Sequence, residues 1–220
     1  MDGASEIMTL PLGVRALSLE RIRRMDFSWM QDAMPARWAR ARRFLREEDR
    51  LLCLGAGFLL RELLGIESEK EISFNEYGKP FAPGRKKFSL SHGGGLCAIA
   101  VSEREVGLDI EKIVQPFPAE AGAVFTEDEK RWAFESGANC GASADSRAYR
   151  LWTMKESAMK AVGLGFFLDP KSFSLVPALS GEAVMVGGKS WRVQSAEAQG
   201  YSVSVCAEAR PQGGRPLEGA

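Results

Sequence analysis

The strongest constraint on the fold is the order in which helical patterns and short alternating runs follow one another along the chain. Apolar side chains recur every three or four positions over residues 35–64 and 148–162, which predicts one or two helices in the first stretch and one in the second. A shorter helical pattern covers residues 127–135. Helices and strands are thus expected on both sides of residues 103–106, and the sequence predicts an α+β protein with a boundary there.

Alternation of apolar and polar residues marks the strands. Two of the alternating runs flank the segment His92-Gly93-Gly94-Gly95, which predicts a hairpin. The small polar residues of 136–146 predict an exposed loop. The strands are expected at residues 71–74, 88–91, 96–102, 106–113, 173–176, 183–186, 191–194 and 201–207.

Charge and cysteine content exclude several classes of protein. Lys and Arg number 29 and Asp and Glu number 29, so no broad basic surface for nucleic acid is expected. No stretch approaches the ~20 apolar residues that a membrane span needs. The four cysteines, at positions 53, 97, 140 and 206, are too widely spaced for a thiolate zinc site, and we expect them to be reduced. These features predict a cytoplasmic protein.

An acidic strand is the sharpest local feature of the sequence. Strand side chains alternate, so Asp109 and Glu111 should share one face of the strand with Gly107, which would leave room for a ligand near the backbone. Two carboxylates on one face suit magnesium, which prefers carboxylate, water and phosphate oxygens. The alternative is an exposed strand face that carries two solvated acids.

Helix 148–162 carries a second candidate group. Trp152, Glu156 and Lys160 are each four residues apart and therefore lie on one face. Glu156 could complete a metal site or accept a proton, and Lys160 could bind a phosphate. An ordinary Glu to Lys helix pair explains the same spacing.

Basic and loop residues supply candidate anion contacts. The sole histidine, His92, precedes three glycines whose backbone amides could face an anion, although a plain hairpin turn needs the same glycines. Arg37 and Arg40 belong to an arginine cluster in the first helix, and Lys79 follows a turn. A solvated helix face is the alternative for the arginines.

Taken in order, these segments resemble the 4'-phosphopantetheinyl transferase family, in its larger pseudo-dimeric type that serves nonribosomal peptide and polyketide synthetases. The resemblance spans about residues 37–165. It departs from the family pattern at Leu52, where relatives often carry Arg, and at Cys53, where a hydroxyl residue is sometimes found. The matching motifs are the arginine-rich helix through Glu48-Asp49, Tyr77-Gly78-Lys79-Pro80-Phe81, Phe88-Ser89-Leu90-Ser91-His92, Gly107-Leu108-Asp109-Ile110-Glu111, residues 125–129 and residues 152–160.

The resemblance implies a fold and a set of site residues. The fold would be two similar α/β halves, each a helix on a small, mainly antiparallel sheet, with the active site in the cleft between them. The expected divisions are residues 1–105, residues 106–210 and a flexible tail, 211–220. Asp109, Glu111 and Glu156 would hold Mg²⁺, with Mn²⁺ as the alternative. Coenzyme A would be bound by Arg37, Arg40, Lys79, Ser91, His92, Asp109 and Lys160, and the catalytic residues would be Glu156 and Lys160.

The implied reaction transfers the 4'-phosphopantetheine arm of coenzyme A to a serine of an acyl or peptidyl carrier protein. A monomer is expected, and residues 117–125 are expected to form part of the carrier surface. Two other functions stay open: a coenzyme A or nucleotide binding protein without transfer activity, and a metal-dependent phosphohydrolase. The hydrolase would usually need more metal ligands, including histidines, than one histidine can supply.

Overall fold

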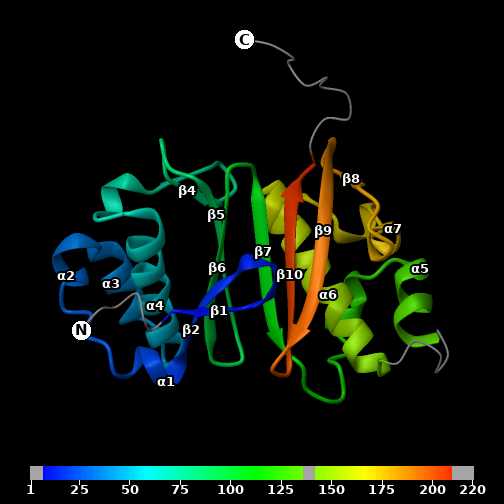
Figure 1. Ribbon diagram of the computed structural model, residues 1–220, viewed down its shortest axis with the longest axis horizontal. Helices are drawn as coiled ribbons and strands as arrows, with labels where there is room; N and C mark the ends of the chain where they lie inside the picture. Colours follow the sequence, from blue (N-terminus) through cyan, green and yellow to red (C-terminus); the bar gives the residue numbers. More distant parts are fainter. Residues whose placement is uncertain (1–6, 136–141, 210–220) are drawn as a thin grey trace, which may run out of the picture.

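The protein is described by a computed structural model that places residues 7–135 and 142–209. Two four-stranded antiparallel sheets stand side by side, with the N-terminal helices on one side and the C-terminal helices on the other (Figure 1). We call residues up to 105 the N-terminal half and residues from 106 onward the C-terminal half. The predicted α+β class is confirmed.

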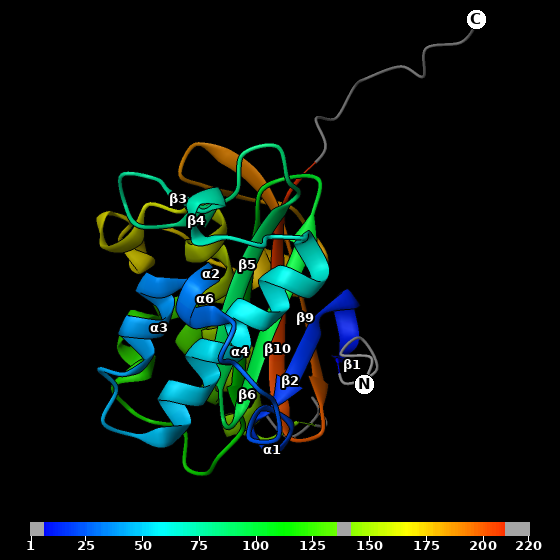
Figure 2. The same ribbon diagram turned by 90° about the vertical axis from the view of Figure 1, so that its left-hand side faces the viewer.

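The N-terminal half packs its helices on one sheet, which Figure 2 shows with the helices in front. The predicted helical stretch 35–64 forms two helices, α3 (Pro35–Ala41) and α4 (Glu47–Leu64). Acidic residues fill the first turn of α4, and Gly65 ends it in a left-handed conformation, as the helix dipole and the steric freedom of glycine favour. The other helices are α1 (Leu19–Ile22) and α2 (Met30–Ala33). The sheet order is β1 (Met8–Thr9), β2 (Arg15–Ser18), β6 (Leu96–Ser102) and β5 (Lys87–Gly93).

The C-terminal half repeats the order of three of these strands. Its long helix α6 (Ala144–Val162) begins at Ser143, whose side chain accepts from the Ser146 amide, and ends at Gly163 with φ 73°. In each half the strand before the long helix pairs with the last strand, and the last strand pairs with the one before it. The sheet order is β7 (Val106–Lys112), β10 (Tyr201–Glu208), β9 (Lys189–Ala198) and β8 (Val184–Val186).

Short elements complete the described chain. The helical pattern at 127–135 is confirmed as α5 (Glu127–Lys130) followed by a π-helical segment, Arg131–Glu135. A small two-stranded sheet joins β3 (Ser73–Phe74) to β4 (Pro80–Phe81). The remaining short helices are α7 (Val176–Leu179), η2 (Pro11–Gly13), η3 (Glu69–Glu71), η4 (Ala121–Val124), η7 (Gly165–Phe167) and η8 (Pro170–Ser172).

Three sequence predictions need correction or completion. The strand predicted at 173–176 does not form, because the Leu175 amide donates to Glu129 and the Val176 amide to Ser174 instead of to a neighbouring strand. Strands β1 and β2 were not anticipated. The predicted loop 136–146 is helical from residue 144, while positions 136–141 lie outside the described residues, as does the tail 211–220.

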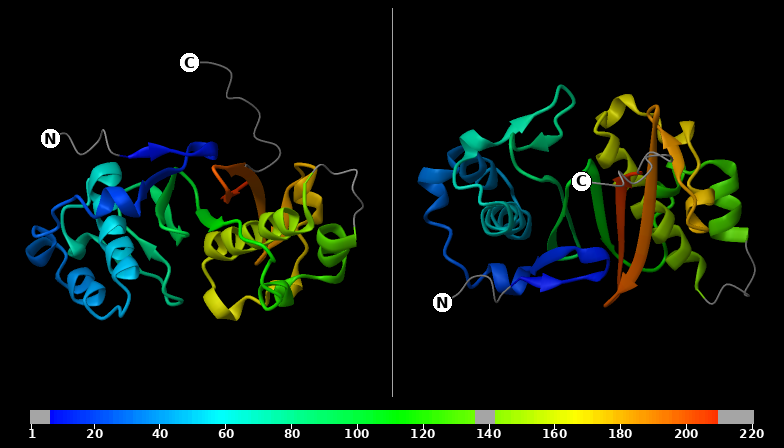
Figure 3. Two further views of the ribbon diagram at one scale, coloured as in Figure 1. Left: turned by 90° about the horizontal axis from the view of Figure 1, so that it is seen from below. Right: turned by 45° about the horizontal axis from the view of Figure 1, so that its top comes forward.

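Two of the three apolar clusters lie beneath α4 and beneath α6, and the third joins the halves. In this third cluster, which we call the seam, the chain around η2 crosses to the C-terminal sheet, as both views of Figure 3 show. Ten buried residues form the seam: Leu10, Val14, Ala16, Leu96, Ala98 and Ala100 from the first half and Val106, Leu108, Ile110 and Val203 from the second.

The described helices include none that is long and apolar enough to cross a membrane. The thiols of Cys53, Cys97 and Cys206 are free, and burial raises the pKa of Cys97 and of Cys206 to about 12. These two cysteines are unreactive core residues, as the sequence predicted.

Candidate active site

A cavity of about 370 Å³ lies between the halves, where the cleft was expected. Its walls include Tyr77, Lys79 and Ser89 from the N-terminal half. Glu156, Lys160 and Gly163, all on α6 or at its end, line it from the other half. Both predicted catalytic residues, Glu156 and Lys160, therefore face a space large enough to hold part of a ligand.

Serine hydroxyls connect strand β5 of one half to strand β7 of the other. The Leu108 amide donates to Ser89 Oγ at 3.0 Å, and the Ile110 amide donates to Ser91 Oγ at 3.3 Å. Gly93 allows the strands to approach, since a Cβ there would lie 2.4 Å from the Ile110 carbonyl oxygen. Gly94 and Gly95 adopt positive φ in the hairpin turn, so the hairpin interpretation of the glycine triplet is confirmed for these two.

Asp109 is the buried centre of a polar network that spans the two halves. Its Oδ1 accepts from Lys160 Nζ at 2.6 Å and from Ser91 Oγ at 2.8 Å. Lys160 Nζ also donates to Ser91 Oγ at 3.1 Å. The Asp109 side chain is 5% exposed, and its Oδ2 has no hydrogen-bond partner among the described residues. A buried carboxylate oxygen without a partner is costly, and a bound cation would relieve that cost.

Burial and the negative charge of Asp109 both raise the pKa of the other two predicted acids, Glu111 and Glu156. Burial and the negative charge of Asp109 raise the pKa of Glu111 to about 7. The same two causes, in the same order, raise the pKa of Glu156. All three acids therefore face one region, and a divalent cation would offset their repulsion.

The acids share this region without forming a compact ligand set. Within residues 7–135 and 142–209, no three His, Cys, Asp or Glu side chains are grouped closely enough to hold a metal ion. Lys160 supplies the positive charge at Asp109 in this arrangement.

Gly107 does not leave space for a ligand, contrary to expectation. A Cβ at this position would lie 1.9 Å from the Ser157 carbonyl oxygen and 2.4 Å from the Ala161 nitrogen. The glycine instead allows α6 to lie directly on β7. This contact is what brings Glu156 and Lys160 to the level of Asp109 on the strand.

His92 and Arg40 lie near the same cluster of charges. Partial burial lowers the pKa of His92, and the cations Lys160 and Arg40 lower it further, while Asp49 and Asp109 act in the opposite direction. The imidazole is therefore neutral at pH 7 and can donate one hydrogen bond to an anion.

Lys79 and Arg37, both predicted coenzyme contacts, are bonded to protein atoms. Lys79 Nζ donates to Glu105 at 2.7 Å and to the Ala161 carbonyl at 2.8 Å. Arg37 is on α3, and its Nη1 donates to the Cys53 carbonyl of α4 at 3.1 Å. Its Nε is buried without a partner among the described residues.

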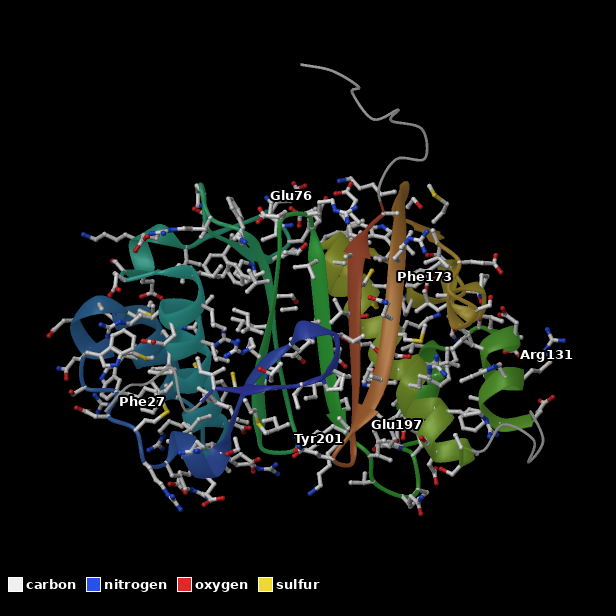
Figure 4. All side chains as sticks on the ribbon, viewed as in Figure 1. Phe27, Glu76, Arg131, Phe173, Glu197 and Tyr201 are labelled. Carbon is white, nitrogen blue, oxygen red and sulfur yellow. The ribbon has the colours of Figure 1, made fainter. Side chains whose placement is uncertain are left out.

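A buried ion pair behind the site was not anticipated from the sequence. Lys155 Nζ lies 2.5 Å from Glu129 Oε2, with the two side chains 1% and 0% exposed. Lys155 also donates to the carbonyl of Phe173, a residue marked in Figure 4. Helical spacing could have indicated this burial, because it places Lys155 away from the Glu156 and Lys160 face and toward the core side of the helix.

The expected carrier surface at 117–125 is corrected in part. Phe117 is 8% exposed and Phe125 is 0% exposed, and the two rings stack in the core with Tyr149 against Phe117. The exposed aromatic residue of this cluster is Phe134, at 46%. Phe117 is therefore not an exposed contact residue of this surface.

The sequence of the chain is similar to one protein family and to several known proteins. The model of the 4'-phosphopantetheinyl transferase superfamily matches residues 105–206. The chain is 35% identical over 137 residues to "4'-phosphopantetheinyl transferase gsp" of Aneurinibacillus migulanus, a match that covers 60% of this chain and 56% of the relative. It is 35% identical over 160 residues to a phosphopantetheinyl transferase of a Thraustochytrium species, covering 62% and 55%.

A third relative is covered over more of its length. The chain is 30% identical over 155 residues to "4'-phosphopantetheinyl transferase Sfp" of Bacillus subtilis, a match that covers 67% of each protein. The match spans just over half of each of the first two relatives.

Proposed function

Because this chain belongs to the 4'-phosphopantetheinyl transferase superfamily, we propose that it transfers the phosphopantetheine arm of coenzyme A to a serine of a carrier protein. The observation that carries the proposal is the buried network of Asp109, Ser91 and Lys160 beside the cavity between the halves. Such a site can neutralise charge on phosphate oxygens, which is the main requirement of this class of reaction.

The proposal assigns separate roles to the two halves. Residues 1–105 would contact coenzyme A through Arg37, Arg40, Lys79, Ser91 and His92, and residues 106–210 would contribute the acids and Lys160. The acceptor would be an acyl or peptidyl carrier protein of a nonribosomal peptide or polyketide synthetase, and the enzyme would act as a monomer. The free thiols fit a reducing compartment, so we place the reaction in the cytoplasm.

We propose a divalent cation beside the acids, which do not form a compact ligand set among the described residues. Asp109 has a buried oxygen without a partner, and the mutual repulsion of the acids favours a cation beside them. Asp109, Glu111 and Glu156 would hold magnesium, or manganese as the alternative. When bound, the cation would neutralise charge on the diphosphate of coenzyme A.

Residues of the chain would act on the serine that attacks and on the phosphate oxygens that gain charge. The carrier serine oxygen forms a bond to the β-phosphorus of coenzyme A, and the bond from that phosphorus to the bridging oxygen breaks, releasing 3',5'-ADP. Lys160 would lie against the phosphate oxygens, where negative charge builds. Glu156 would take the serine proton, directly or through a water.

Mass spectrometry of an apo carrier protein with coenzyme A and magnesium tests the function. The carrier should gain one phosphopantetheine. Coenzyme A binding with an unchanged carrier would favour a binding protein, and release of free phosphate would favour a phosphohydrolase. Neither alternative is favoured by the superfamily match.

A matched pair of variants tests the base. Glu156→Gln keeps the shape of the side chain and should slow transfer by at least about 10²-fold, because a neutral amide cannot accept the proton. Glu67→Gln, which removes an exposed acid of the other half, should keep the wild-type rate. Full transfer by Glu156→Gln at saturating magnesium would exclude Glu156 as base and as an essential ligand.

A further inference from the structure

The turn between β3 and β4 is held in shape by one side chain. Asn75 Oδ1 accepts from the Tyr77 amide at 3.0 Å and from the Lys79 amide at 2.8 Å. The Asn75 amide donates to the Lys79 carbonyl at 3.0 Å, which closes the turn. Asn75 therefore determines the position of Tyr77 and Lys79, which both line the cavity.

The same side chain crosses to the other half. Asn75 Nδ2 donates at 2.8 Å to the carbonyl of Gly163, the residue that ends α6. Lys79 Nζ donates to the carbonyl of Ala161, two residues before Gly163, at 2.8 Å. These are carbonyls that the helix itself leaves without partners, and a cation at this end is favoured by the helix dipole.

The approach at this point is close. A Cβ at Gly163 would lie 2.7 Å from Lys79 Cδ and 3.3 Å from Asn75 Nδ2. We call Asn75 and Lys79, with their bonds to Gly163 and Ala161, the clasp. In Figure 4 the neighbouring Glu76 marks this end of the boundary between the halves, and Tyr201, which donates to the Gly94 carbonyl, marks the opposite end.

The clasp holds the end of the helix that bears the reactive side chains. Lys160 lies one residue before Ala161, and Glu156 lies one turn earlier. Lys160 must reach Ser91 and Asp109 on two strands, so a small shift of the last turn would displace its Nζ. A misplacement of about 1 Å at a reacting centre can cost about 10²-fold in rate.

We infer that Asn75 is a positioning residue, which sets the last turn of α6, and with it Lys160, for the diphosphate of coenzyme A. This role rests on the proposed function. The turn segment is thus more than a wall of the cavity: its asparagine couples the coenzyme-facing loop of one half to the reactive helix of the other.

Two substitutions separate the clasp from the turn. Asn75→Asp keeps an oxygen for the Tyr77 and Lys79 amides but loses the donor to Gly163 and places a negative charge near the helix C-terminus. Asn75→Ala loses both functions. Glu76→Gln, an exposed neighbour on the same turn, is the control.

Hydrogen exchange tests the contact without any substrate. In Asn75→Asp, amides of residues 160–163 should exchange about 10-fold faster than in the wild type, because the loss of a hydrogen bond and an unfavourable charge both loosen the last turn. Amides near residues 148–152 should be unchanged, as should the whole helix in Glu76→Gln. Unchanged exchange at 160–163 in Asn75→Asp would overturn the inference.

Coenzyme A affinity tests the positioning. By calorimetry, Asn75→Asp and Asn75→Ala should both bind coenzyme A about 10-fold more weakly, while the KM for the carrier stays within about twofold of the wild type. Wild-type affinity in Asn75→Asp with weakened affinity in Asn75→Ala would assign the effect to the turn alone and overturn the inference. If the wild-type chain binds no coenzyme A, the proposed function fails, while the exchange experiment still decides whether Asn75 holds the helix.

Discussion

The two halves of the molecule share the order of three strands, and the cores beneath their long helices differ in polarity. Beneath α4 the core is apolar, with Leu59, Leu60 and Ile66 fully enclosed. Beneath α6 the core includes the Lys155 and Glu129 ion pair, and Thr153 Oγ1 lies 2.9 Å from Ser202 Oγ. Hydrogen bonds and ion pairs require defined distances and directions between named atoms. The polar contacts therefore lie beneath α6, the helix whose Glu156 and Lys160 side chains must keep a fixed position relative to the sheet.

The largest expected difference between the halves lies in their ion pairs. Glu129→Gln should lower the free energy of unfolding by about 3–5 kcal/mol, because it leaves the Lys155 charge buried without its partner. The matched N-terminal change, Glu67→Gln, removes the partner of Arg61 at a site where the two side chains are 67% and 38% exposed. It should cost no more than about 1 kcal/mol.

Urea denaturation measures both ion-pair variants. The double variant Glu129→Gln with Lys155→Met should recover much of the lost stability, because no buried charge is then left. Similar losses in Glu129→Gln and Glu67→Gln would remove the contrast between the two cores.

Glycine contacts should give a smaller difference. Gly107→Ala places a Cβ against backbone atoms of α6 and should cost about 1–3 kcal/mol, or more if the helix cannot move. Gly55→Ala in α4 meets the end of the Ile22 side chain, at 2.7 Å from Cδ1, which can rotate away. Gly55→Ala should therefore be the milder change in thermal unfolding, and it should leave the position of Lys160 unaltered.

The smallest expected effect is a difference in pH dependence. The Glu111 pKa is raised from 4.5 to about 7, so between these values the folded state binds more protons than the unfolded state. Stability should fall as pH rises through this window and then level off. Because Glu111 is only partly buried, solvent screening reduces the effect to about 1 kcal/mol.

Glu71 in the N-terminal half should show the opposite sign. Its hydrogen bond from Arg85 lowers its pKa, so its contribution is present above pH 4.5 and is lost as pH falls. Glu111→Gln should reduce the decline between pH 4.5 and 7, and Glu71→Gln should reduce only the loss of stability in acid. An unchanged pH dependence of stability in Glu111→Gln would contradict the assignment for Glu111.

The sequence predicted those parts of the site that depend on local periodicity. Alternation placed Asp109 and Glu111 on one strand face, and four-residue spacing placed Glu156 and Lys160 on one helix face. The periodicity could not say which atoms would lie opposite these faces. The close contact of Gly107 with Ser157, and the bond from Ser91 to Asp109, depend on how separate elements pack.

The misplaced strand at 173–176 has the same physical origin. Residues of this segment alternate as a strand would, but their backbone amides bond to side chains, including Glu129 on a distant helix. The alternation of apolar and polar residues shows that a segment can form a strand. Contacts with the rest of the fold decide whether its backbone amides bond to a strand or to side chains. Lys79 and Arg37 are comparable, since their charges suggested a ligand and both bond to protein acceptors. Lys79 donates to Glu105 and to the Ala161 carbonyl of α6, and Arg37 donates to the Cys53 carbonyl of α4.

The seam has a consequence for the thermodynamics of the whole chain. It takes apolar residues from both sheets, so neither half can lose its structure without uncovering the outer face of the other. The protein should consequently melt in one calorimetric endotherm, despite a layout that suggests two independently melting units.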